Sequence, residues 1–276
     1  MRWNSEPDMK NKAIGVFDSG LGGLTAVREL IKVLPSEDII YFGDTARLPY
    51  GTRSPEMVTR FAEQDLRFML THDLKAILVA CGTISSVALP VLSRISPVRI
   101  TGVVTPASEK AVQSTKNGRI LVLGTGTTVN SRSYEKAIAA IDPGISVKAV
   151  ACPMFVPLVE NGFSSPGDKV ATLVARKYLD PVKDFGADTV ILGCTHFPIL
   201  SDVIGQCLGD VVLVDSGKAA ADDLSVYLKQ NGLCRSDGGK STFYVSDEVS
   251  NFASLAEICL HRSLEGKVKK VNIEDY

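Results

Sequence analysis

This chain has almost no net charge and few histidines. Its 276 residues carry 30 Lys and Arg against 31 Asp and Glu, for a formal net charge of −1, and only three histidines. A balance this close to zero gives no long-range field that would attract nucleic acid or an anionic membrane, so neither is expected as a partner. No cysteine pair has C-x-x-C spacing, and with so few histidines we expect no metal site.

Long apolar runs are also absent. No stretch approaches the roughly 20 apolar residues that a membrane-spanning helix needs, and Met1–Lys12 lacks the apolar segment of a signal peptide. We therefore expect a cytoplasmic protein with a flexible tail over residues 1–12. The chain has six cysteines, but in a reducing cytoplasm free thiols are expected rather than disulfides.

Short apolar runs alternate with segments of helical periodicity along the chain. This alternation predicts an α/β fold of mainly parallel sheets flanked by helices, in which ligands bind beyond the carboxyl ends of the strands. The strand candidates are Ala13–Phe17, Ile39–Phe42, Ala76–Ala80, Arg99–Val104, Arg119–Leu123, Ser146–Val150, Thr189–Leu192 and Val211–Val214. The helix candidates include Leu24–Leu34, Pro55–Leu70, Ser131–Ile141, Asp168–Phe185 and Lys218–Gln230.

Two cysteines, Cys81 and Cys194, occupy matching local settings. Each follows an apolar, β-branched run and precedes a Thr or Gly-Thr and a helix-like segment. The free N–H groups at the start of a helix favour thiolate over thiol. The segments Val16-Phe-Asp18-Ser-Gly and Leu213-Val-Asp215-Ser-Gly form a second, weaker match. We therefore expect two similar lobes related by a pseudo-twofold axis, with one thiol on each side of a central cleft.

The chain is expected to cross from the first lobe to the second near Val104 and to return near Asp215. The first lobe would then be discontinuous, made of residues 13–103 and 214–276, and the second would hold residues 104–213.

His196 is the candidate partner of a thiol, because it stands two residues after Cys194, where it can assist as acid or base. The alternative is a histidine that happens to begin a helix before Pro198. Each cysteine alone is equally compatible with a small buried apolar residue, but the matched settings of Cys81 and Cys194 favour chemistry. The cysteines without such a setting are expected to be packing or surface residues: Cys152, Cys207, Cys234 and Cys259.

A glycine-rich turn follows the first strand candidate, in Asp18-Ser19-Gly20-Leu-Gly-Gly23. It departs from the dinucleotide-binding pattern, so a nucleotide site is not expected. Asp18 either caps the following helix or orients a proton-transfer group or an ammonium, and the residues leave both interpretations open.

Three further segments offer polar groups at strand or helix ends. Pro49-Tyr50-Gly51 forms either a pocket wall or an ordinary turn. Gly124-Thr125-Gly-Thr127-Thr128 is suited to bind a carboxylate through hydroxyls and amides. Glu160 is a carboxylate in apolar surroundings or a solvated glutamate at a helix end.

Together these motifs resemble the bacterial glutamate racemases, cofactor-independent members of the aspartate/glutamate racemase superfamily. The resemblance extends from about Ala13 to about His261. In the related aspartate racemases a glutamate commonly follows the second Cys-Thr, so His196 favours the glutamate branch. The matching motifs are Gly15-Val-Phe-Asp18-Ser19-Gly20-Leu-Gly-Gly-Leu, Tyr41-Phe-Gly-Asp44-Thr, Pro49-Tyr50-Gly51, Ala80-Cys81, Val156-Pro-Leu-Val-Glu160 and Gly193-Cys194-Thr195-His196-Phe-Pro.

The resemblance implies racemisation of L- and D-glutamate without a cofactor, which supplies D-glutamate for peptidoglycan synthesis. It implies that Cys81 removes the α-proton of D-glutamate with help from Asp18, and that Cys194 removes that of L-glutamate with help from His196. Glutamate is the expected partner, and a homodimer is one arrangement found in the family. The expected substrate contacts combine the residues implied by the resemblance with the threonines of the segment Gly124–Thr128. They are Ser19, Pro49, Tyr50, Gly51, Gly82, Thr83, Thr125, Thr127, Thr128, Thr195 and Glu160.

One position departs from the family pattern. Many members carry Asn after the first cysteine, with its side chain on the substrate, whereas this chain has Gly82. We expect recognition at that edge to come from Thr83, Ser85, water or the backbone. An Asn at position 82 would fit if the edge is open and would overpack the site if a neighbour such as Ile84 fills it.

Two other classes of function compete with racemisation. A decarboxylase or hydrolase on the same scaffold would need one working cysteine, and the matched pair counts against it. A binding protein without activity would have no need of the full set Asp18, Cys81, Cys194 and His196, so the intact set counts against that class.

Overall fold

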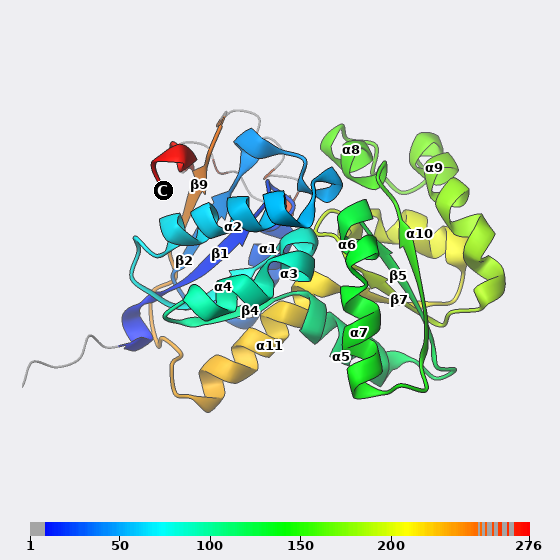
Figure 1. The fold of residues 1–276 in the computed structure, drawn as a ribbon, viewed down its shortest axis with the longest axis horizontal. Helices are drawn as coiled ribbons and strands as arrows, with labels where there is room; N and C mark the ends of the chain where they lie inside the picture. Colours follow the sequence, from blue (N-terminus) through cyan, green and yellow to red (C-terminus); the bar gives the residue numbers. More distant parts are fainter. Residues whose placement is uncertain are drawn as a thin grey trace, which may run out of the picture.

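Two lobes lie side by side in the computed structural model, each built on its own parallel sheet (Figure 1). The structure describes residues 9–247, residues 249, 252, 256, 259, 260 and 264, and residues 268–276. Most of the expected N-terminal tail and His261 lie outside the described residues. Met9–Asn11, at the end of that tail, form a 3-10 turn.

The first sheet has six parallel strands in the order β10-β9-β2-β1-β3-β4. Strands buried on both faces give continuous apolar runs, as in β1 and β3, where every residue is buried. The helices α1 (Leu24–Val33) and α11 (Ser216–Gln230) cover one face. The other face packs against α2 (Pro55–Met69), α3 (Gly82–Val87) and α4 (Leu89–Ile95). The strands are β1 (Ala13–Asp18), β2 (Ile39–Gly43), β3 (Leu74–Val79), β4 (Arg99–Gly102), β9 (Ser241–Val245) and β10 (Val268–Lys270).

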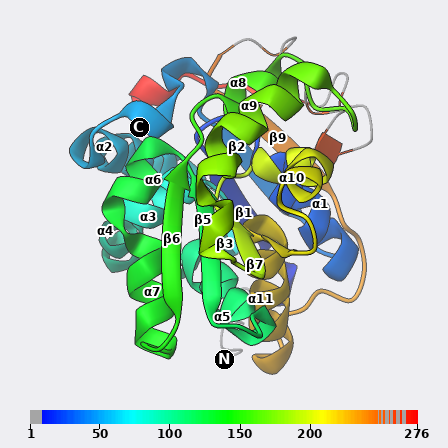
Figure 2. The same ribbon diagram turned by 90° about the vertical axis from the view of Figure 1, so that its right-hand side faces the viewer.

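The second sheet has four parallel strands in the order β6-β5-β7-β8. They are β5 (Arg119–Gly124), β6 (Ser146–Ala151), β7 (Thr189–Leu192) and β8 (Val212–Asp215). One face packs against α8 (Phe155–Glu160), α9 (Lys169–Leu179) and α10 (Ser201–Leu208). On the other face lie α5 (Val104–Ser114), α6 (Gly126–Ser131) and α7 (Ser133–Ile141), as Figure 2 shows. The expected α/β class with two mainly parallel sheets is confirmed.

The structure differs from the expected elements in several places. The strand expected over Arg99–Val104 ends at Gly102, and Val104 begins α5. β9 and β10 were not expected. The helix expected over Asp168–Phe185 ends at Leu179, and a 3-10 turn with Pro181 in its first turn continues to Phe185, because proline lacks the N–H that a longer helix needs. The helix expected over Ser131–Ile141 begins at Ser133 as α7. A helix that was not expected, α6, ends at Ser131, and the two are separated by Arg132, which adopts the left-handed conformation with φ +56°.

The chain passes to the second sheet after β4 and returns to the first sheet with β9. The expected lobe boundaries remain a prediction. The expected division after residue 213 cuts β8, whose pairing with β7 extends to Asp215.

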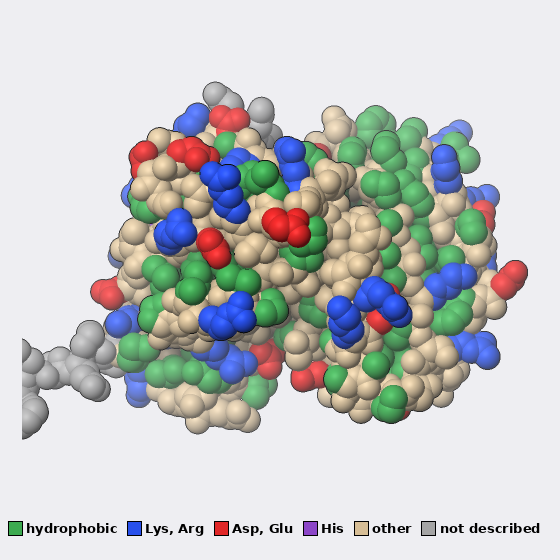
Figure 3. Space-filling model, viewed as in Figure 1, with side chains coloured by type: hydrophobic (Ala, Val, Ile, Leu, Met, Phe, Trp, Pro, Cys, Tyr) green, Lys and Arg blue, Asp and Glu red, His purple; other side chains and the backbone are tan. Residues whose placement is uncertain are grey.

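Charged side chains show no segregation between the two lobes on the face seen in Figure 3, where basic and acidic groups are mixed. This distribution agrees with the near-zero net charge. Among the described residues, no helix has the length and apolar character to cross a bilayer.

Candidate active site

A cavity of about 340 Å³ lies where the carboxyl ends of the two sheets face each other. In parallel sheets this is the end at which ligands bind. Its wall comes from loops that follow β1, β2 and β3 in one lobe and β5, β6 and β7 in the other. The structure brings most of the predicted site residues to this wall: Ser19, Pro49, Tyr50, Gly51, Cys81, Gly82, Thr83, Thr125, Glu160, Cys194, Thr195 and His196.

Cys81 lies on the first-lobe side of the cavity, at the N-cap of α3. Its sulfur accepts a hydrogen bond from the backbone N–H of Ile84 at 3.5 Å and lies 3.4 Å from the hydroxyl oxygen of Ser19. Burial, followed by the charge of Asp18, raises the pKa of the Cys81 thiol to about 12, and the contact with Ser19 offsets only part of that rise. Cys81 is therefore a thiol, and hence a proton donor, at neutral pH.

Cys194 lies on the second-lobe side and belongs to a chain of three polar side chains. Its sulfur is 3.8 Å from Nδ1 of His196, and Nε2 of His196 is 3.1 Å from Oε1 of Glu160. Burial lowers the pKa of His196, but the contacts with Cys194 and Glu160 outweigh it and raise that pKa to about 10. A positive imidazole therefore lies beside the sulfur of Cys194 at neutral pH, the setting in which cysteines act as bases.

Asp18 is fully buried behind the wall and does not line the cavity. One carboxylate oxygen, Oδ2, accepts hydrogen bonds from the N–H groups of Gly20 and Gly23 at the start of α1. The other oxygen, Oδ1, has no hydrogen-bond partner among the described residues. Burial raises the pKa of Asp18, and the charge of His196 works against that rise. Oδ2 of Asp18 therefore holds the turn before α1, whose N-cap is Gly23, while Oδ1 is left without a partner among the described residues.

The loop that carries Tyr50 is held by a buried polar cluster behind the cavity. The Tyr50 hydroxyl donates to Oδ2 of Asp44 and lies 3.4 Å from Oδ2 of Asp65. Arg47 binds the same two carboxylates. Burial, with the charge of Asp44 added, raises the pKa of Asp65. Because its hydroxyl is bound within the first lobe, Tyr50 positions the loop and presents its remaining atoms to the cavity.

Thr127 and Thr128 lie outside the cavity wall, which corrects the expectation that they contact substrate. The Thr127 hydroxyl is 3.0 and 2.9 Å from the carbonyl oxygens of Gly51 and Arg53 in the opposite lobe. The Thr128 hydroxyl lies 3.0 Å from that of Thr125 within α6 and its cap. Both hydroxyls are thus used to hold the structure, while Thr125 does line the cavity.

The wall also contains residues that the sequence analysis did not select. Cys152, expected to be a packing or surface residue, lines the cavity directly after β6. Its position could have been found with the rule that selected the other two cysteines, because Ser146–Val150 is also a strand candidate. The remaining additions are Leu48, Thr52, Gly126, Pro153, Val156 and Pro157. They carry no ionisable side chain, so in the sequence only their position in loops after strands indicates that they could line a site.

The edge beside Gly82 is closed. A Cβ at position 82 would lie 2.1 Å from the carbonyl oxygen of Gly193, which comes from the opposite lobe. The neighbour there is thus neither Ile84 nor Ser85. The Ser85 hydroxyl is bound to Val79 and Val103 and lies outside the wall. Thr83 remains at this edge, with its Oγ1 3.0 Å from Oγ1 of Thr125 across the cleft.

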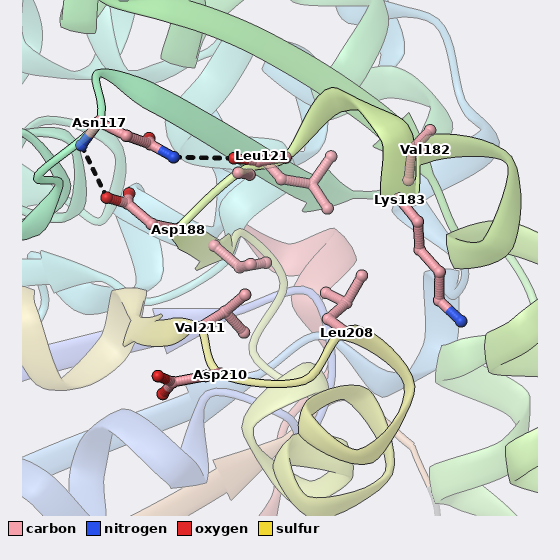
Figure 4. A pocket seen from close by; sticks show the side chains of 11 residues that line it. Asn117, Leu121, Val182, Lys183, Asp188, Leu208, Asp210 and Val211 are labelled. Atoms are coloured by element: carbon pink, nitrogen blue, oxygen red, sulfur yellow. Dashed lines mark hydrogen bonds between the residues drawn. The ribbon is translucent and has the colours of Figure 1, made fainter.

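A second cavity, of about 370 Å³, lies at the opposite end of the second sheet (Figure 4). Its wall includes apolar side chains such as Leu121, Val182 and Leu208. Asp188 at its edge is bound by the N–H groups of Lys116 and Asn117. This cavity is at the amino ends of β5 and β7, away from the end where parallel sheets bind ligands. Within the described residues, no group of three or more His, Cys, Asp or Glu is arranged to hold a metal ion.

Related proteins match this chain along almost its whole length. The profile of the Asp/Glu/Hydantoin racemase family matches residues 18–224. The glutamate racemase of Geobacter metallireducens is 44% identical over 266 residues, which cover 95% of this chain and 97% of the relative.

Solved structures agree. Glutamate racemase from Francisella tularensis, solved with D-glutamate, superposes with a TM-score of 0.90 at 37% identity, covering 97% of this chain and all of that one. The enzyme from Thermus thermophilus, solved with beta-chloro-D-alanine, gives a TM-score of 0.87 at 41% identity, covering 97% and 99% of the two chains. The chain therefore belongs to the Asp/Glu/hydantoin racemase family, in its glutamate racemase branch, and is an isomerase.

Proposed function

We propose that this chain interconverts L- and D-glutamate by proton transfer at two cysteines, and that it supplies D-glutamate for peptidoglycan synthesis. The observation that carries the proposal is the arrangement of Cys81 and Cys194, one from each lobe, on the wall of a single cavity. The Francisella relative, solved with D-glutamate, supports glutamate as the ligand.

The reaction inverts one carbon, so it needs a base on one face and an acid on the other. In the L-to-D direction the Cys194 thiolate takes the α-proton of L-glutamate, and the carbanion takes a proton from the thiol of Cys81. In the D-to-L direction Cys81 is the base and Cys194 the acid. Identical residue types suit this task because each residue must act in both roles.

The two cysteines have different neighbouring charged groups. The positive His196 lies beside Cys194, while buried, negative surroundings keep the proton on Cys81. In this scheme Glu160 holds the charge of His196, and Asp18 assists Cys81 through its unpartnered oxygen.

The developing carbanion adds negative charge beside the α-carboxylate. The hydroxyls of Ser19, Thr83, Thr125 and Thr195 line the cavity and are the groups that would receive the substrate's carboxylates. Ser19, Thr125 and Thr195 lie on loops at strand ends, and Thr83 lies in the first turn of α3. The pair of thiols counts against a decarboxylase or hydrolase that needs one cysteine.

The test is incubation with L-glutamate in D₂O, followed by proton NMR of the α-position and by circular dichroism of the amino acid. We expect loss of optical activity together with α-deuterium in the product. L-Aspartate, one methylene shorter, is the control substrate and is expected to react much more slowly. Unchanged optical activity of glutamate, or equal rates on both amino acids, would contradict the proposal.

A further inference from the structure

The two lobes meet beside the thiols through a pair of glycines. Gly82 follows Cys81 and begins α3, and Gly193 precedes Cys194 after β7. A Cβ built on Gly82 would lie 2.1 Å from the carbonyl oxygen of Gly193 and 3.1 Å from its carbonyl carbon. The backbones therefore approach more closely than any residue with a side chain at position 82 allows.

Neither side of this contact has room to retreat. The N–H of Gly193 donates to the carbonyl of Leu123 at 2.8 Å, which fixes Gly193 to the second sheet. A Cβ on Gly193 would itself meet that same carbonyl at 2.8 Å and the ring of Tyr134 at 3.0 Å, so Gly193 is packed from behind. On the other side, the first turn of α3 closes with a hydrogen bond from Ser85 to the carbonyl of Cys81.

Two other glycines would place a Cβ within 3 Å of the opposite lobe, but their neighbours there are side chains. A Cβ on Gly22 would meet the Thr195 hydroxyl and the His196 ring, and one on Gly51 would meet the side chain of Thr125. At Gly22 the neighbouring side chains can turn to other rotamers at modest cost, whereas the nearest atom at Gly51 is the Thr125 Cβ at 2.7 Å, which no rotamer change moves. The approach at Gly82, 2.1 Å to a backbone carbonyl, is the closest of the three and the one made to a backbone atom.

We propose that the contact of Gly82 with the Gly193 carbonyl sets the separation of the Cys81 and Cys194 thiols across the cavity. This inference rests on the proposed two-thiol reaction. Gly82 is then a positioning residue, acting through the cysteine that precedes it. The absence of a side chain at position 82 also means that the substrate meets backbone and Thr83 at this edge.

A single methyl group at position 82 tests the idea. To reach ordinary van der Waals contact, the methyl and the carbonyl would have to separate by roughly 1.3 Å. Since both backbones are anchored, the lobes themselves must part, and the two cysteines move with them. A misplacement of about 1 Å in a reacting group costs about 100-fold in rate, so we expect Gly82→Ala to lose about 100-fold in kcat/KM.

Two alanine variants serve as controls. Gly126 is the positional match, because it too begins a six-residue helix after a strand and lines the cavity, but its Cβ would meet only the Gly51 carbonyl at 3.6 Å. Gly126→Ala is expected to lose far less activity than Gly82→Ala. Gly205 lies in α10 with nothing within 4 Å of its Cβ, so Gly205→Ala is expected to behave as the parent.

The decisive experiment starts from L-glutamate in D₂O and measures two products, L-glutamate deuterated at the α-carbon and D-glutamate. The readout is the ratio of the first product, formed without inversion, to the second, formed by inversion. If the thiols have moved apart, Cys194 still removes the α-proton and returns a deuteron after exchange with solvent, while Cys81 no longer delivers to the other face. The ratio should rise at least tenfold in Gly82→Ala and stay at the parent value in Gly126→Ala. A merely structural role for Gly82 would lower both processes together and leave the ratio unchanged.

Each outcome separates this inference from the proposed function. A parent enzyme that leaves glutamate unchanged would refute the proposed function. If the parent enzyme racemises glutamate and Gly82→Ala shows the same ratio of deuteration without inversion to inversion as the parent, this inference alone is refuted. If circular dichroism and thermal unfolding show that Gly82→Ala does not fold, Gly193→Ala displaces the same carbonyl from behind, and the same rise in the ratio is expected of it.

Discussion

The Nε2 atom of His196 lies 3.1 Å from Oε1 of Glu160, and this contact ties the charge of the imidazole to the stability of the folded chain. Because the pKa of His196 rises to about 10 in the folded state from an ordinary 6.5, the folded chain binds this proton more tightly than the unfolded one. The stabilisation is complete below about pH 6.5 and is lost as the pH rises toward 10.

We therefore expect the free energy of unfolding to fall between pH 6.5 and pH 10 by on the order of 3 kcal/mol more in the parent than in His196→Gln. Urea unfolding at several pH values measures it. His72→Gln is the control, since burial lowers the pKa of His72 and its removal leaves the decline in place. Parallel pH profiles for the parent and His196→Gln would show that His196 is not charged in the folded chain.

Removal of the thiol of either Cys81 or Cys194 is expected to stop racemisation. Cys81→Ala and Cys194→Ala each delete the proton-transfer group on one face, so kcat should fall by about 10³-fold or more, with circular dichroism spectra unchanged. Cys207→Ala is the control, because Cys207 is buried in α10 away from the cavity. Wild-type turnover in either cavity variant would end the two-thiol mechanism.

The partners of the two thiols are expected to act in opposite directions. Asp18→Asn should chiefly lower kcat from D- to L-glutamate, and His196→Asn that from L to D, because each residue assists a different thiol. The equilibrium between enantiomers is fixed, so kcat/KM must fall equally in both directions for each variant. Measurement of kcat, KM and solvent isotope effects in both directions decides it. Indistinguishable effects of the two variants would remove the assignment of partners.

Thr127 is expected to matter for substrate binding although it lies outside the cavity wall. Thr127→Val keeps the shape of the side chain but leaves the carbonyls of Gly51 and Arg53 without their donor, at a cost of about 1–3 kcal/mol. The loop that carries Gly51 should loosen, and KM for glutamate should rise several-fold with a smaller change in kcat.

The control for that change is Thr172→Val. Its hydroxyl donates to the carbonyl of Asp168 in α9, outside the cavity wall. Steady-state kinetics of both variants make the comparison. An unchanged KM in Thr127→Val would show that this contact does not position the loop.

The buried strands were predictable from the sequence because both faces of a central parallel strand are covered. β1 and β3 are wholly buried and are continuous apolar runs but for Asp18 at the end of β1 and Lys75, whose ammonium pairs with Glu37. β9 and β10 were both missed. β10 is a three-residue strand at the sheet edge with Lys269 and Lys270 exposed, so it is too short to show a periodic pattern.

The site residues that follow buried strands or belong to motifs were predictable from the sequence. Cys81 and Cys194 follow buried strands, and the structure places both on the cavity wall. The roles of Thr127 and Gly82 could not be predicted, because both are decided by contacts with the opposite lobe. Sequence patterns describe one element at a time and contain no information on how two lobes approach each other.

The strand order of the first sheet also governs the timing of folding. β2 pairs with β1 on one side and with β9 on the other, and β9 is made nearly 200 residues later. The second sheet needs only residues up to Asp215. On the ribosome the second lobe is therefore able to close while β2 is still an open edge of the first. An unpaired strand of buried, apolar residues is a template for association with other chains. The nascent chain is thus most exposed to aggregation, and most dependent on chaperones, in the interval before residues 241–245 emerge.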